Sequence, residues 1–138
     1  MFRPLSLAAA VLLAAAPSAP PAGGLDASMK QMSEALKVLE KGVTAQNEAE
    51  ALAELAKFES ALIAAKSEVP DSAEKVDEKK RPAYVADYRK TLVATLKLAL
   101  DAEVAIADHK YKDADSLIRN KLVAQKSAGH SKFKPEGK

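Results

Sequence analysis

Residues 25–41, LDASMKQMSEALKVLEK, decide the fold of this chain. Their apolar side chains recur at alternating spacings of four and three, and the pattern continues to Val43, two residues beyond the stretch: Leu25, Met29, Met32, Leu36, Leu39 and Val43. At about 100° per residue these side chains project as one narrow stripe, which predicts an amphipathic helix with a single buried face. Asp26 is the predicted N-cap of this helix, and Gly42 is the predicted C′ residue.

Three further segments carry helical stripes of the same kind. The second is predicted from Asn47, which with Glu50 forms an N-x-x-E capping signature, to Val69, just before a proline. The third begins with Pro82 in its first turn, and the fourth covers residues 111–133. In chain order the three stripes are Leu52, Leu55, Phe58, Leu62, Ala65 and Val69; Val85, Tyr88, Leu92, Leu96, Ala99 and Ile106; and Ala114, Leu117, Ile118, Leu122, Ala124 and Ala128.

The connections between these helices are short, apart from residues 70–81. Alternating Asp, Glu and Lys residues in that stretch predict a solvated loop with no buried face. The sequence contains no strand pattern and no internal repeat. Four amphipathic helices joined in this way predict an all-α fold, an antiparallel up-down-up-down four-helix bundle over residues 25–133.

The first 18 residues have the layout of a secretory signal peptide. A positive start at Arg3 is followed by an apolar run from Leu5 to Ala16 and by small residues up to Ser18. The run is too short for a membrane span, so we expect none in the mature chain. Such a signal directs a protein to the periplasm or outside the cell. Residues 19–24 are predicted to form a flexible lead-in, and residues 134–138 a disordered tail.

Composition narrows the function classes. The chain has no cysteine, which excludes disulfides and the C-x-x-C-H attachment of a c-type haem. Its formal net charge of +2 implies no strong attraction to nucleic acid. No Ser/His/Asp set, paired buried carboxylates or phosphate-binding glycine loop is visible, so the sequence does not predict an enzyme.

Two side chains distant in sequence are candidates for binding a metal. Met29 falls in the first turn of the first predicted helix and His130 in the last turn of the fourth, so the bundle topology predicts that they share one end. A thioether facing an imidazole is one means of holding haem iron. A bare copper or other metal site is a weaker interpretation, because two ligands are too few.

Periodicity alone leaves the role of both residues open. A methionine in a helical stripe is usually a flexible core filler, and Met32 has the same interpretation. His130 lies about 80° round the helix from Leu122, at the edge of the apolar stripe. That position is equally compatible with a half-exposed structural histidine and with a ligand that reaches a cofactor in the open end of the bundle.

Three motifs carry a resemblance to a known family. Residues 25–41, with LKVLEK at 36–41, resemble the first helix of the cytochrome b562 family. DYR at 87–89 resembles an Asp-aromatic-Arg stretch of that family, and GHSKFK at 129–134 resembles its terminal histidine with an aromatic three residues later. The likeness spans essentially the whole predicted mature chain. This family is itself a standard example of the up-down-up-down bundle, so its fold is not independent support for that architecture.

The resemblance implies a soluble periplasmic protein that holds one non-covalent haem b and passes electrons to a redox partner that the sequence does not identify. Met29 and His130 would be the axial ligands, which leaves iron no free position for oxygen or a substrate. The residues implied to line the porphyrin faces are Met32, Tyr88 and Leu92. Lys126 and Lys134 stand where family members often have arginine near the haem propionates, and lysine offers a charge but no bidentate fork.

An alternative class is a cofactor-free periplasmic helical bundle that acts as a binding or chaperone-like module. The lysine-rich tail, the lysines in place of arginine and the edge position of His130 favour this class.

Overall fold

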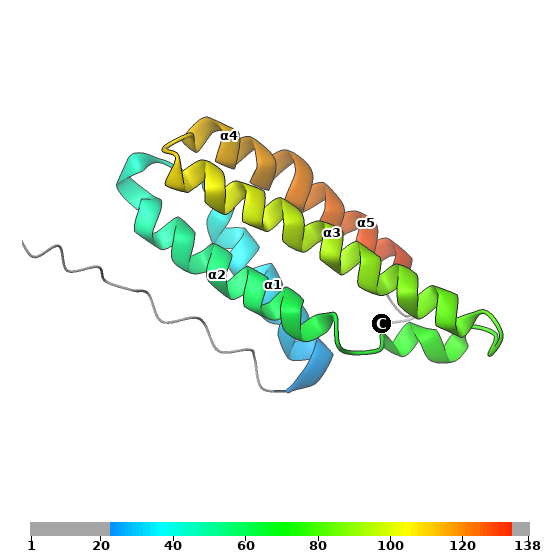
Figure 1. Cartoon of the computed structure of the whole chain (residues 1–138). Coiled ribbons are helices and arrows are strands. Elements are labelled where there is room, and N and C mark those ends of the chain that lie inside the picture. The colour runs from blue at the N-terminus through cyan, green and yellow to red at the C-terminus, as the bar shows by residue number, and fades with distance from the viewer. Residues whose placement is uncertain (1–22, 134–138) are drawn as a thin grey trace, which may run out of the picture.

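The computed structural model describes residues 23–133. These residues form helices connected by two 3₁₀ turns and one π turn, and no strand occurs among them. The elements are α1 (Gly24–Leu39), a 3₁₀ turn (Ala45–Asn47), α2 (Glu48–Ala65), a 3₁₀ turn (Asp71–Lys75), α3 (Arg81–Ala107), α4 (Tyr111–Ser116), a π turn (Leu117–Leu122) and α5 (Val123–Phe133). The π turn joins α4 and α5 into one rod, so the predicted bundle of four helical rods is confirmed (Figure 1).

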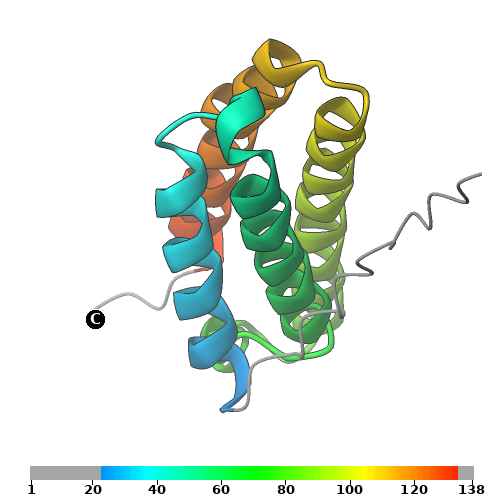
Figure 2. The ribbon, with the colours of Figure 1, turned by 90° about the vertical axis from the view of Figure 1, so that its left-hand side faces the viewer.

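Successive rods run in opposite directions, and the last rod lies beside the first (Figure 2). The start of α1 and the end of α5 therefore lie at the same end of the bundle, as the topology predicts. The predicted signal peptide, the predicted tail with Lys134, and most of the predicted lead-in lie outside the described residues. Among the described residues, no helix is both long enough and apolar enough to cross a membrane.

Leucine and alanine side chains fill the centre of the bundle. Leu36, Leu55 and Ile106 are fully buried, and Phe58 and Leu62 are nearly so. Burial of one such large side chain stabilises the fold by about 1.5–3 kcal/mol. The alanines let the rods approach closely but contribute little each, so the few large side chains carry most of the hydrophobic stabilisation.

The turn between α1 and α2 requires glycine at residue 42. Gly42 has φ of +112°, and a Cβ there would lie 2.9 Å from the Arg119 guanidinium. One predicted cap is wrong, because Asp26 lies inside the first turn of α1 and Gly23 is the residue before the helix. Asn47 is the N-cap residue of α2, as predicted, but its side chain makes no capping bond to α2 and instead accepts a hydrogen bond from the Thr44 backbone N–H (2.7 Å). Asn47 therefore pairs with the residue three before it and not with Glu50.

The second helix is shorter than predicted. α2 ends at Ala65, and Val69 lies beyond it and is 57% exposed. α3 begins with Pro82 in its first turn, as predicted, and ends at Ala107. His109, two residues later, has φ of +57°, and the chain reverses there toward α4. A non-glycine residue in this left-handed region is uncommon and marks a sharp turn.

The connection at residues 70–81 is not the solvated loop that its charges predict. Pro70, Ser72 and Ala73 are buried, whereas the acidic and basic residues around them face solvent. Ser72 Oγ donates a hydrogen bond to the Phe133 carbonyl (2.8 Å) and lies 2.7 Å from the Tyr84 hydroxyl. The prediction failed because a 3₁₀ turn gathers three small or apolar side chains on one face, and this face ties the connection to the end of α5.

Two alanines that were predicted to be core residues of the fourth helix are exposed, namely Ala124 and Ala128. The straight-helix counting behind that prediction fails because the π turn precedes both residues. Ala114, Ile118 and Leu122 are buried as predicted.

Candidate cofactor-binding pocket

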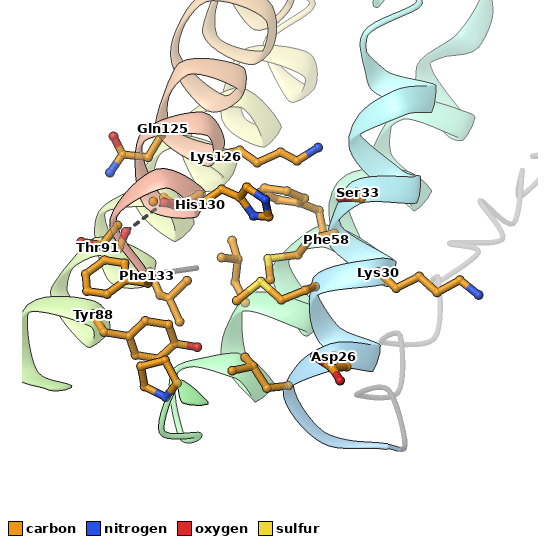
Figure 3. Close-up of a pocket in the computed structure, with 18 of the residues that line it drawn as sticks. Asp26, Lys30, Ser33, Phe58, Tyr88, Thr91, Gln125, Lys126, His130 and Phe133 are labelled. Atoms are coloured by element: carbon orange, nitrogen blue, oxygen red, sulfur yellow. Dashed lines mark hydrogen bonds between the residues drawn. The ribbon is translucent and has the colours of Figure 1, made fainter. Parts of the chain in front are cut away.

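A pocket of about 420 Å³ opens at the end of the bundle where α1 begins and α5 ends. Its walls come from α1, α2, α3 and α5 (Figure 3). Pro70 and Asp71, in the connection between α2 and α3, also line it. A volume of this size is in the range of sites for cofactors and other small molecules. The open end of the bundle therefore has the size and shape of a small-molecule binding site.

The α1 wall of the pocket presents two thioethers. Met32 is buried, and Met29, one turn nearer the start of the helix, is 37% exposed. The spacing of three places both on the same face of α1. Met32 therefore packs in the depth of the pocket, whereas Met29 lies toward solvent.

The walls from α2 and α3 are apolar. Phe58 and Leu62 of α2 and Leu92 of α3 are buried and line the pocket. The hydroxyls of α3 in this region are bonded to backbone carbonyls, since Thr91 donates to Asp87 O (3.0 Å) and Thr95 to Thr91 O (2.8 Å). Bonded in this way, the threonines present their methyl groups, so the wall suits an apolar macrocycle or ring.

Tyr88 packs deep in the pocket with its hydroxyl already engaged. Its O–H donates to Ala65 O at 3.1 Å, at the end of α2. Burial, with a smaller contribution from the Glu68 charge, raises the pKa of Tyr88 to about 12. The phenol therefore stays neutral at physiological pH. Its ring presents an apolar face to the pocket, and the hydrogen bond of its hydroxyl fixes the orientation of the ring.

The α5 wall carries His130 and Phe133. His130 is exposed, and its ring reaches from α5 toward the pocket (Figure 3). Phe133 is buried and meets the rings of Tyr84 and Tyr88 edge-on, with both centroid distances 5.3 Å. Gly129 faces α3, and a Cβ there would lie in ordinary contact with the Thr91 methyl, at 3.5 Å. This wall is held by packing on one side of the imidazole and is open to water on the other.

Charged side chains surround the mouth of the pocket. Lys30 and Lys126 supply two cations, and Asp26 and Asp71 supply two anions. Lys30 extends away from the pocket (Figure 3). Acidic groups of a bound cofactor would therefore find a cation at the rim, but no bidentate guanidinium among these four side chains.

The donor set suits an iron porphyrin better than a bare ion. Within residues 23–133, no group of three or more His, Cys, Asp or Glu side chains could hold a metal. One thioether and one imidazole are too few ligands for an ion by itself, but they are sufficient when a macrocycle supplies the remaining ligands. The apolar walls and the two donors on facing helices thus fit a haem.

The structure brings most of the predicted site residues together. Six of them line this one pocket, and Lys134 lies outside the described residues; the six are Met29, Met32, Tyr88, Leu92, Lys126 and His130. Sequence reasoning did not identify Phe58 and Leu62 as lining residues, although both belong to the predicted stripe of the second helix. It also missed Pro70 and Thr95, for which the sequence carries no signal. The place of Pro70 depends on the path of the connection between α2 and α3, and the apolar character of Thr95 depends on the bond from its hydroxyl to the backbone.

Comparison with known proteins agrees with the four-helix fold. The family model described as cytochrome b562 matches residues 24–134. No curated protein matches the chain.

Proposed function

The chain belongs to the cytochrome b562 family, which implies a haem-binding electron-transfer protein, and from this premise we propose that it carries one non-covalent haem b between Met29 and His130. The observation that supports the proposal is the shared pocket. Residues near opposite ends of the sequence line one apolar cavity from α1 and α5, and they are of the two types that ligate iron in Met/His cytochromes.

Each part of the pocket has a role in this proposal. The Met29 sulfur and one His130 ring nitrogen would both bind the iron. Met32, Tyr88 and Leu92 would pack against the ring faces and exclude water. Lys126 would neutralise an acidic group at the rim, and Lys134 is proposed for the same role. When bound, haem held in this way supplies a one-electron couple whose potential is raised by the thioether ligand.

The proposed activity is electron transfer without catalysis of a substrate reaction. Two side-chain ligands would leave no iron position open for a substrate, and α1 and α5 would hold the two donors. The exposed side of His130 lies at the mouth of the pocket, where a redox partner protein could dock. We place the protein in the periplasm, on the basis of the signal-peptide pattern in residues 1–18. N-terminal sequencing of the mature protein from a periplasmic fraction tests that placement.

A hemin titration of the ligand-free protein tests the proposal. We expect near-stoichiometric uptake and, after reduction with dithionite, a low-spin ferrous spectrum. Met29→Leu should give a high-spin spectrum, whereas Met32→Leu, which removes a thioether from the same helix face, should remain low-spin. His130→Ala should lose the low-spin spectrum, and His109→Ala, at the other histidine, should not.

The alternative function has its own signature in this experiment. A broad Soret band without defined stoichiometry, the same in all four variants, would contradict the cytochrome assignment and favour a cofactor-free binding module.

A further inference from the structure

The rod that carries His130 is not a regular α-helix. Residues Leu117–Leu122 form a π turn between α4 and α5, and the Val123 N–H bonds to the carbonyl of Ile118, five residues back. A π turn accommodates one more residue than the α-helix would, and such turns occur frequently at functional sites. The rod therefore contains one residue more than an uninterrupted helix of the same length.

The extra residue changes which side chains of α5 face the bundle. Counted from buried Ala114 at about 100° per residue, His130 would lie about 160° away in a regular helix, on the solvent side. Absorbing one residue in the π turn removes about 100°, so His130 lies about 60° from Ala114. By the same count, Phe133 moves from about 100° to about 0°, directly in line with Ala114.

The observed burial follows the corrected count. Phe133 is buried and Gly129 half-buried, whereas Ala124 and Ala128 are exposed. In a regular helix Ala128 would lie about 40° from Ala114 and would be expected in the core. Its exposure indicates that the rotation of α5 relative to α4 is real in the packed structure and is not a local irregularity of the backbone.

Packing contacts on both sides of the π turn fix the rotation of α4 and of α5 about their helix axes. Before the turn, Ala114 is fully buried, and so is Ile118 in the first part of the turn itself. After it, the Phe133 ring packs against Tyr88, and its carbonyl accepts the hydrogen bond from Ser72. The turn therefore connects two helical segments whose orientations are each fixed by packing.

We propose that the π turn at Leu117–Leu122 is the positioning element that turns His130 and Lys126 onto the pocket. This inference rests on the proposed role of His130 as an iron ligand. A helix with one residue fewer would present His130 on the same face without any π turn, whereas a helix with one residue more would turn it away.

Two variants at the exposed Asn120 test this asymmetry. Deletion of Asn120 should convert the π turn to α-helix and keep His130 in place, with a low-spin spectrum on hemin addition and a dissociation constant within about threefold of wild type. Insertion of one alanine after Asn120 should rotate α5 by about 100°, abolish the low-spin spectrum and weaken hemin binding by about tenfold or more. If the π turn had no positioning role, a shift of one residue in either direction would misplace His130 equally.

A ligand-free measurement separates this inference from the proposed function. Near-ultraviolet circular dichroism of the apoprotein reports the packing of Phe133 against Tyr84 and Tyr88. The signal should persist in the deletion variant and decrease in the insertion variant. Loss of the signal, of folding or of low-spin ligation in the deletion variant would overturn the inference, as would full retention in the insertion variant. A wild-type protein that does not bind hemin would overturn the proposed function and leave the circular dichroism comparison as the test of the π turn.

Discussion

Ser72 lies in the charged connection between α2 and α3, which the sequence alone predicts to be a solvated loop. Replacing Ser72 with alanine should nevertheless lower the stability of the protein. Ser72 is 7% exposed, and its hydroxyl joins the Phe133 carbonyl (2.8 Å) to the Tyr84 hydroxyl (2.7 Å). The substitution removes both hydrogen bonds and leaves the Phe133 carbonyl buried without this donor. We expect the free energy of unfolding to fall by about 1–3 kcal/mol.

Thermal unfolding of the ligand-free protein, followed by far-ultraviolet circular dichroism, measures this loss. A cost near 2 kcal/mol corresponds to a decrease in Tm of about 8 °C for a domain of this size. Because Phe133 lies three residues after His130, we also expect weaker hemin binding by the variant. Ser67→Ala, at an exposed serine just after α2, is the matched control and should change Tm by no more than about 2 °C. Equal Tm values for Ser72→Ala and wild type would refute the anchoring role of the 3₁₀ turn.

Two further predictions concern the remainder of the bundle. Burial, with a smaller contribution from the Glu103 carboxylate, raises the pKa of Glu59 from 4.5 to about 7. Between these two values the folded state keeps a proton that the unfolded state releases. The free energy of unfolding therefore falls as pH rises from about 4.5 to about 7. Glu59→Gln should therefore stabilise the folded protein by about 1 kcal/mol at pH 8, after allowance for solvent screening, and by almost nothing at pH 4. Urea unfolding at both pH values measures this difference, and an equal effect at both would contradict the prediction. Gly42→Ala should lower the free energy of unfolding by about 1–3 kcal/mol because residue 42 has a positive φ, whereas Gly129→Ala should be neutral or slightly stabilising. Similar losses of stability in the two variants would argue against backbone strain as the cause.

The helical periodicity was sufficient to predict the four rods and their order. Spacings of three and four mark the buried face of α1, and Pro82 marks the start of α3, because both signals act within one or two helical turns. The convergence of Met29 and His130 on one pocket followed from topology alone, since the first and last rods of an up-down bundle are neighbours. Their role as iron ligands remains a prediction.

The features that sequence reasoning missed depend on tertiary packing. Ser72 and Ala73 are small residues in a charged stretch, and Ser72 is buried where its hydroxyl contacts Tyr84 and the end of α5. The π turn has no local sequence signal, since Leu117, Ile118 and Leu122 fit a slowly drifting α-helical stripe equally well. Packing on both sides of the turn decides where the extra residue is absorbed, and so decides the exposure of Ala124 and Ala128.

The central claim is that a sulfur atom from α1 and a nitrogen atom from α5 bind the same iron. X-ray absorption at the iron edge of the hemin-loaded protein tests this claim most directly, because it distinguishes sulfur from nitrogen in the coordination sphere. We expect one sulfur ligand in wild type and in Met32→Leu, and none in Met29→Leu. Iron with only nitrogen or oxygen ligands in the wild-type protein, or a sulfur ligand that persists in Met29→Leu, would contradict the account.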